Sequence, residues 1–168
     1  MAELVAYTDG GCRGNPGIGG WGFVLIDPRT YDALERAGGS DHTTNNRMEM
    51  QAAIEALSAI EDAARPVVVR TDSLYLLKSC SLWLAGWKEL GWRRKAGPLL
   101  NIDLLQRLDE LQSRRRVRWE WVRGHAGDLG NEHADRLAGE AIDRIARGDP
   151  LPHERRFRWA AAPPRRRR

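Results

Sequence analysis

The sequence has few cysteines and no long apolar run. Its 168 residues include two cysteines, Cys12 and Cys80, which are too few for a disulfide framework. No apolar stretch approaches the roughly 20 residues that a membrane-spanning helix needs. The first residues also lack the basic and then apolar pattern of a secretion signal. We therefore expect a cytoplasmic protein without a membrane partner, and a monomer, since no segment is typical of a dimer interface.

Positive charge is concentrated near the end of the chain. The net charge is +4, yet residues 151–168 contain seven arginines and one acid, so the rest of the chain is slightly negative. The high isoelectric point therefore does not by itself indicate a body that binds nucleic acid. We predict one domain over residues 1–146 and a Pro/Arg-rich, flexible tail over residues 147–168.

Hydrophobic periodicity predicts alternating strands and helices after an initial group of strands. The expected strands are residues 4–9, 21–26, a weak one around 31–41, 67–69 and 117–122. The expected helices are residues 45–60, 73–84, 102–112 and 131–145. This order is typical of an α/β fold in which helices flank a mixed sheet.

Four carboxylates occur on faces that otherwise suit burial. Asp9 lies in the first strand, Glu49 in the first turn of the first helix, Asp72 directly after the fourth strand, and Asp135 beside the apolar stripe of the last helix. Taken alone, Asp72 is typical of a helix cap and Asp135 of a salt bridge. Four such acids together indicate a metal site, because buried carboxylates are costly without a partner. Oxygen ligands without cysteine favour Mg²⁺ or Mn²⁺, and a pair of such ions about 4 Å apart can cleave a phosphodiester.

Five segments resemble, in order, the motifs of type 1 (bacterial HI) ribonucleases H. They are residues 7–17, 43–49, 71–73, 119–127 and 131–135. The resemblance covers about residues 1–146. It implies an RNase H-like fold, with a five-stranded mixed sheet in the order 3-2-1-4-5. It also implies hydrolysis of the RNA strand of RNA–DNA hybrids, which leaves 5′-phosphate and 3′-hydroxyl ends.

The resemblance also implies roles for the acidic residues. Asp9 would bridge two metal ions, Asp135 would help hold the ion that activates water, and Glu49 and Asp72 would help hold the other. His125 matches the mobile catalytic histidine of the family, and a histidine side chain exchanges protons near neutral pH. We expect the other histidines to be structural: His42, His133 and His153.

Two sets of substrate contacts follow from the same resemblance. Contacts along the minor groove are expected from the backbone at Cys12 and Asn15 and from the side chain of Asn45, with the polar Asn46 beside them. A pocket for a DNA phosphate is expected at Thr44 and Asn101. Residues 44–46 also fit the N-terminus of a helix, which itself suits phosphate.

Residues 83–95 interleave tryptophans with cations, including Trp83, Trp87 and Lys88. Such a mixture suits a nucleic-acid backbone, although tryptophans packed between helices beside solvated cations would give the same pattern. The segment resembles the basic protrusion of bacterial ribonucleases HI. Leu74 departs from the resemblance, because many relatives have a polar residue there, and this could alter one groove contact.

Two other functions remain open on the sequence. A nuclease or transferase of the same fold that acts on DNA would share the acidic cluster, but not the context at residues 12–15 and 43–46. A noncatalytic module that binds hybrids would be expected to lack one or more of the four carboxylates, and here all four positions are filled.

Overall fold

The computed structural model describes residues 2–149 and 152–160. Its elements, in chain order, are β1 (Leu4–Arg13), β2 (Gly17–Ile26), β3 (Asp32–Thr43), α1 (Asn45–Ser58), β4 (Val67–Thr71), α2 (Leu74–Lys78), the π-helix η1 (Ser79–Trp83), α3 (Leu84–Glu89), α4 (Ile102–Ser113), β5 (Val117–Trp121), α5 (Leu129–Arg147) and β6 (His153–Arg158). The predicted α/β class is confirmed.

The strands form one mixed sheet in the order β5-β4-β1-β2-β3-β6. β1 pairs antiparallel with β2 and parallel with β4, which in turn pairs parallel with β5. The predicted order 3-2-1-4-5 is therefore present, with six strands rather than five. Central β4 is buried at Val67, Val68 and Val69, which is why this strand is apolar throughout instead of alternating.

The sixth strand corrects the prediction of a flexible tail for residues 153–158. β6 pairs antiparallel with β3, with Arg155 opposite Glu35 and His153 opposite Ala37. The buried Glu35 carboxylate accepts one hydrogen bond from Arg155 at 2.9 Å and lies 2.7 Å from Nε2 of His153. Because these inward-facing residues of β6 are polar, the strand lacks the apolar alternation from which strands are predicted. The rest of the predicted tail includes residues 150–151 and 161–168, which lie outside the described part of the chain.

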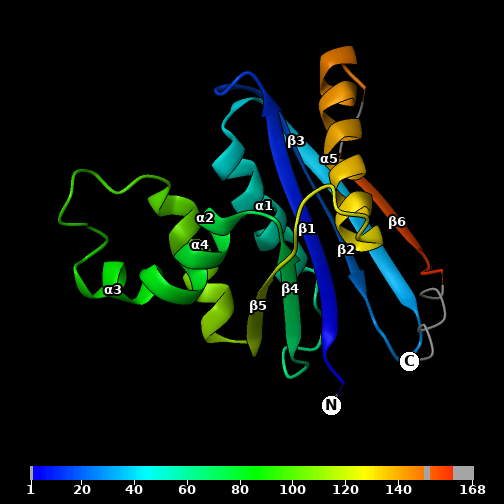
Figure 1. Cartoon of the computed structure of the whole chain (residues 1–168), viewed down its shortest axis with the longest axis horizontal. Helices are drawn as coiled ribbons and strands as arrows, with labels where there is room; N and C mark the ends of the chain where they lie inside the picture. Colours follow the sequence, from blue (N-terminus) through cyan, green and yellow to red (C-terminus); the bar gives the residue numbers. More distant parts are fainter. Residues whose placement is uncertain (1, 150–151, 161–168) are drawn as a thin grey trace.

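Helices cover both faces of the sheet (Figure 1). α1 packs on β1 and β2 on one face, with α4 behind it, while α5 packs on β1, β2 and β3 on the other face. The main core lies between the sheet and α1, and includes Phe23, Met50 and Leu105. No helix within residues 2–149 and 152–160 is long and apolar enough to cross a membrane.

The helix predicted over residues 73–84 is instead a succession of three helical segments. α2 begins after Ser73, whose hydroxyl accepts a hydrogen bond from the Leu76 N–H, and it passes through η1 into α3, which ends at Glu89. Periodicity alone does not distinguish a π-turn from an α-turn, so the interruption was not predicted. The segment that follows extends away from the sheet (Figure 1).

Candidate active site

Asp9 and Asp72 come from adjacent parallel strands in matching positions. The last paired residues of β1 and β4 are Tyr7 and Arg70. Asp9 lies two residues after Tyr7, and Asp72 lies two residues after Arg70. Residues in register on neighbouring parallel strands lie side by side. The sheet therefore brings the two carboxylates to the same place, although they are far apart in the sequence.

Glu49 reaches this place because α1 begins directly against β1. Thr44 caps the helix, and its hydroxyl accepts a hydrogen bond from the Arg47 N–H at 3.3 Å. Gly10 permits the close approach, since a Cβ atom there would lie 2.3 Å from the carbonyl carbon of Met48 and 2.6 Å from the Glu49 nitrogen. Any side chain at position 10 would push α1, and Glu49 with it, away from the strand.

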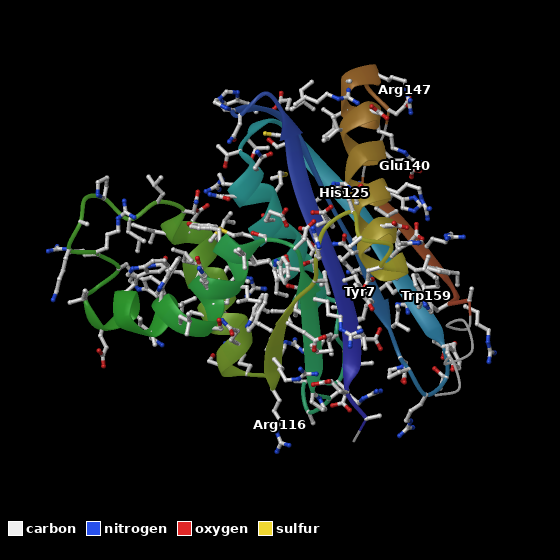
Figure 2. All side chains as sticks on the ribbon, viewed as in Figure 1. Tyr7, Arg116, His125, Glu140, Arg147 and Trp159 are labelled. Atoms are coloured by element: carbon white, nitrogen blue, oxygen red, sulfur yellow. The ribbon has the colours of Figure 1, made fainter. Side chains whose placement is uncertain are left out.

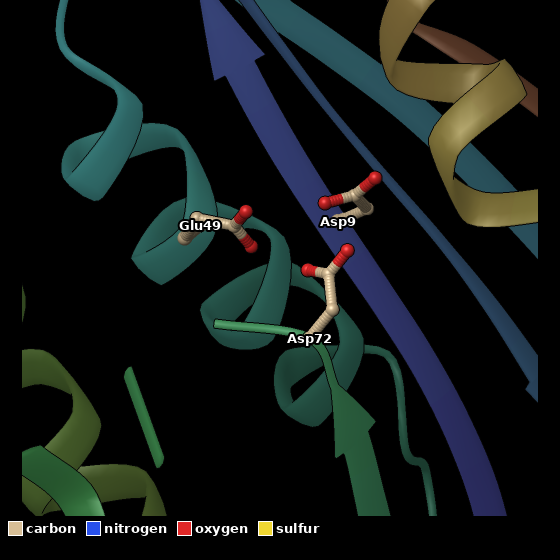
Figure 3. A group of neighbouring side chains, drawn as sticks. All are labelled: Asp9, Glu49 and Asp72. Carbon is tan, nitrogen blue, oxygen red and sulfur yellow. The ribbon is translucent and has the colours of Figure 1, made fainter. Parts of the chain in front are cut away.

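Three of the four predicted carboxylates form a compact cluster (Figure 3). Asp9, Glu49 and Asp72 each present a carboxylate oxygen, and these three oxygens all lie within 4.8 Å of one another. Asp9 is buried, while Glu49 and Asp72 are half-buried. The Gly10 N–H donates a hydrogen bond of 2.9 Å to Oδ1 of Asp9, which helps to orient that carboxylate.

Burial and mutual repulsion change the acidity of the cluster. Burial, followed by the charge of Asp72 and a hydrogen bond with Asp135, raises the pKa of Asp9 to about 8. Burial, followed by the charges of Asp9 and Asp72, raises the pKa of Glu49 well above its usual value. Without a counter-charge, the protein therefore resists full ionisation of the cluster.

The cluster fits a divalent cation. Oε2 of Glu49 is buried and has no hydrogen-bond partner among the described residues, and a buried carboxylate oxygen without a partner is costly. A cation would supply the missing interaction and relieve the repulsion. A site made only of carboxylate oxygens suits Mg²⁺ or Mn²⁺.

Asp135 lies beside this cluster but is not part of the group of three. It is exposed on α5, whose apolar face is buried through Ala134, Leu137 and Ala138. Its carboxylate is near enough to Asp9 to contribute to the raised pKa of that residue. Asp9 is therefore flanked by Glu49 and Asp72 on one side and approached by Asp135 from the opposite face of the sheet.

His125 is exposed in the loop that joins β5 to α5 (Figure 2). Its backbone has a left-handed conformation, with φ of 55°. The preceding residue, Gly124, contacts the cluster directly, since a Cβ atom there would lie 2.7 Å from Oδ2 of Asp72. The loop thus lies against Asp72, with His125 one residue further along. Gly124 had no predicted role, although its place before His125 in the fourth motif could have suggested one.

The residues predicted to follow the minor groove are joined by hydrogen bonds. Oδ1 of Asn45 accepts a hydrogen bond of 2.8 Å from the Cys12 N–H, and the Asn45 N–H donates one of 3.2 Å to Oδ1 of Asn15. The turn between β1 and β2 is thereby attached to the first residues of α1. Asn46 is exposed at the same end of the helix.

Arg47 connects the two residues predicted to bind a DNA phosphate. It follows the Thr44 cap in the first turn of α1, and its guanidinium donates a hydrogen bond of 3.4 Å to Oδ1 of Asn101. It also forms a bidentate pair with Asp103, at 2.9 and 2.7 Å. We predicted no role for Arg47, although it lies inside the second motif between Asn46 and Glu49.

The predicted basic protrusion contains an aromatic pair. The rings of Trp83 and Trp87 have centroids 5.8 Å apart and are tilted by 49°. Trp83 is exposed, and Lys88 forms a 3.0 Å ion pair with Asp109 of α4. The segment therefore presents the exposed ring of Trp83 near the cation of Lys88.

Comparison with known families agrees with this geometry. The RNase H family model matches residues 1–143. The chain belongs to the RNase H family. Its sheet and flanking helices are the RNase H-like fold, with β6 added at one edge.

This RNase H chain has close bacterial relatives. It is 54% identical over 147 residues to a ribonuclease H of Alkalilimnicola ehrlichii, an alignment that covers 84% of this chain and 96% of the relative. It is 49% identical over 154 residues to a ribonuclease H of Methylorubrum extorquens, where 89% of this chain spans 66% of the relative's length.

A similar solved structure is that of LC11-RNase H1 in complex with an RNA/DNA hybrid. It has a TM-score of 0.63 and 27% sequence identity, and the match covers 86% of this chain and 99% of that protein. The shared fold extends over nearly the whole of that protein.

Proposed function

We propose that this chain is an endoribonuclease that hydrolyses the RNA strand of RNA–DNA hybrids and leaves 5′-phosphate and 3′-hydroxyl ends. The observation that carries this proposal is the cluster of Asp9, Glu49 and Asp72 in a member of the RNase H family. The hybrid bound by LC11-RNase H1 supports the same class of substrate here. We further propose that the enzyme acts in the cytoplasm as a monomer.

The four carboxylates are proposed to hold two Mg²⁺ ions, or Mn²⁺ ions, when the hybrid is bound. Asp9 suits a bridging position because both Asp72 and Asp135 act on its pKa. In this arrangement Asp135 would help hold one ion, and Glu49 and Asp72 would help hold the other. Such ions would supply an activated water and stabilise the leaving oxygen.

His125 is proposed to move a proton during the reaction or the release of product. Its exposed position on a loop allows the imidazole to reach solvent. The contact between Gly124 and Asp72 keeps the loop beside the carboxylates. A histidine suits this task because it gains and loses a proton near neutral pH.

Recognition of the hybrid is proposed to depend on three surfaces. The turn and helix end with Cys12, Asn15, Asn45 and Asn46 would contact the minor groove, where the 2′-hydroxyl marks the RNA strand. Thr44 and Asn101 would bind a DNA phosphate, and the segment with Trp83, Trp87 and Lys88 would contact the backbone further away. The hydrogen bonds among Cys12, Asn15 and Asn45 support the first assignment, since they hold these groups in place before binding.

Cleavage of an end-labelled hybrid tests the function. Single-stranded RNA, duplex RNA and duplex DNA are tested separately for comparison. Each substrate is tested with Mg²⁺ and with EDTA, and Asp9→Asn is the inactive control. We expect metal-dependent cutting of the RNA strand of the hybrid alone. Binding without cutting would instead identify a noncatalytic module, and cutting of duplex DNA would identify a nuclease or transferase of the same fold that acts on DNA.

A further inference from the structure

A groove of about 370 Å³ lies where the end of β6 meets α5. We call it the α5–β6 groove, and the residues that matter for its chemistry are Leu129, His133, Arg136, Phe157, Arg158 and Trp159. Half of these come from β6 and the residue after it, beyond the part of the chain that the family model matches. The groove therefore depends on β6, the strand that the predicted five-stranded sheet lacks.

Three rings form the apolar wall of the groove. His133 stacks on Phe157 with centroids 5.6 Å apart and planes 17° apart, and it meets Trp159 edge-on at 5.3 Å. The Trp159 N–H donates a backbone hydrogen bond of 2.8 Å to the Tyr31 carbonyl, which holds this ring at the end of β6. His133 is 11% exposed and Phe157 is covered by His133 and Arg155, so the half-buried Trp159 is the ring that a flat ligand can reach.

The edge of the groove is mainly cationic. Arg136 and Arg158 line it, and the Arg155 guanidinium lies 4.2 Å from the Phe157 ring centroid, beside the same wall. Glu132 is the one acid among the described residues that line it. Aromatic rings beside cations suit unpaired nucleotides, because a base stacks on a ring while its phosphate meets a cation. A paired base offers no free face for this contact.

The groove and the candidate active site share helix α5, which supplies residues to both. His133 faces β3, where it bonds Glu35, while Asp135 faces β1, where it acts on Asp9, so the groove and the carboxylate lie on different sides of the same helix. Figure 2 shows Trp159 near the N-terminal end of α5, opposite to Arg147, and the loop with His125 leads into that same end. A strand that leaves the carboxylate cluster would have to pass the N-terminal end of α5 to reach the groove on its other side.

We propose that the α5–β6 groove binds unpaired nucleotides that extend from the end of the hybrid, with a base stacked on Trp159 and a phosphate near Arg158. The proposal rests on the function proposed above, because it extends the path of the same substrate. It gives the enzyme higher affinity for hybrids with a single-stranded end than for blunt hybrids.

Fluorescence anisotropy in EDTA, without cleavage, tests this directly. The probes are a short blunt hybrid and the same hybrid with an oligo(dT) or an oligo(U) overhang, which distinguishes DNA from RNA as the occupant. We expect an overhang to lower Kd at least about fivefold, the effect of one stacked base. Trp159→Ala should abolish this gain and leave blunt binding unchanged, whereas Trp159→Phe, which keeps a ring, should retain most of it.

Two arginines of β6 provide a matched pair of variants. Arg158→Ala removes a cation from the groove and should reduce the gain in affinity that an overhang gives. Arg156→Ala removes the same charge from a different pocket, which is lined by Leu4 and Glu61, and should leave that gain unchanged. Thermal melts show whether each variant is folded. Equal affinity of the unmodified protein for blunt and overhanging hybrids would overturn the proposal, and so would a full gain in folded Trp159→Ala.

Failure of this proposal is distinguishable from failure of the proposed function. If the blunt hybrid is bound and then cut with Mg²⁺ but overhangs add nothing, only the groove proposal is wrong. If the hybrid is neither bound nor cut, the proposed function is wrong. In that case, binding of free oligo(dT) tests the groove alone. Binding by the unmodified protein that is lost in Trp159→Ala would support the groove proposal, and equal binding by both proteins would overturn it.

Discussion

Gly124 lies directly against the carboxylate of Asp72. A Cβ atom on Gly124 would stand 2.7 Å from Oδ2 of Asp72, so this position accepts no side chain unless the loop or the carboxylate moves. The contact joins the loop that contains His125 to the acidic cluster. It ties together two parts of the site that are about fifty residues apart in the sequence.

Gly124→Ala should therefore impair activity more than stability. Because the added methyl group displaces Asp72 or the loop, we expect kcat to fall by roughly 10- to 100-fold, as misplacement by about 1 Å commonly causes. Steady-state cleavage of a labelled hybrid measures the loss. Gly139→Ala is the control, since a Cβ atom there meets nothing within 4 Å and should leave kcat unchanged. Normal kcat in folded Gly124→Ala would show that the contact is not needed for catalysis.

Asp9→Asn should stabilise the metal-free protein while abolishing cleavage. The pKa of Asp9 is raised to about 8 by burial, by the charge of Asp72 and by a hydrogen bond with Asp135. Between about pH 4 and pH 8 the folded state therefore holds a proton that the unfolded state has released, so stability falls as the pH rises through this window. Relief of about 2 kcal/mol would raise Tm by roughly 4–8 °C at pH 8.

Thermal melts in EDTA from pH 5 to pH 8 measure this difference, which should grow with pH. Asp41→Asn, at an exposed position outside the cluster, should have no such effect. Addition of Mg²⁺ should raise Tm of the unmodified protein at pH 8 and have little effect on Asp9→Asn. A lower Tm for Asp9→Asn at pH 8 would contradict the repulsion inferred for the cluster.

Glu35→Gln should destabilise the fold through β6. Burial would raise the pKa of Glu35, but hydrogen bonds from Arg155, His153 and His133 outweigh this effect and hold the pKa below its usual value. The ionised carboxylate therefore stabilises the folded state above the usual glutamate pKa, and this contribution is lost as the pH falls through the lowered value. We expect a loss of about 1–3 kcal/mol near pH 7.

Denaturant unfolding at pH 7 and at low pH measures this loss, which should shrink in acid. Glu154→Gln is the matched control, because Glu154 makes an exposed pair with Arg36 and such pairs contribute about 0–1 kcal/mol. Equal stability of Glu35→Gln and Glu154→Gln at pH 7 would mean that the buried carboxylate does not hold β6 in place.

The sequence predicts the acidic cluster well because its chemistry is local. Asp9, Glu49 and Asp72 each stand out as carboxylates on faces that otherwise suit burial, and the motifs around them are short and ordered. The close approach that unites them depends on Gly10 and on strand register, which belong to the tertiary structure. The sequence predicts that Asp135 is one of the site carboxylates. Its position outside the compact group of three depends on how α5 packs, which the sequence does not predict.

The sequence does not predict β6, because its stabilising contacts are long-range and polar. Glu35 is separated from Arg155 by 120 residues, and no local pattern indicates that a glutamate in β3 is buried. The aromatic residues Phe157 and Trp159 appear in the sequence as part of an arginine-rich tail. Only their pairing with β3 and α5 makes them the wall of a groove.

Asn45 offers a test of whether the turn between β1 and β2 contacts the substrate or only maintains the fold. Its Oδ1 accepts the Cys12 N–H at 2.8 Å. Asn45→Ala removes that acceptor and should raise KM for the hybrid about tenfold, equivalent to about 1.4 kcal/mol, with a smaller change in kcat. Asn45→Asp keeps the acceptor but adds a negative charge beside the minor groove.

The two variants separate the structural role from the contact role. If Asn45 touches the hybrid, Asn45→Asp should retain the Tm of the unmodified protein and yet bind the hybrid more weakly, because its carboxylate repels the phosphates and cannot donate a hydrogen bond. If Asn45 acts only by holding Cys12, Asn45→Asp should behave normally and Asn45→Ala alone should be impaired. Measurements of KM, kcat and Tm on the same preparations decide between these outcomes.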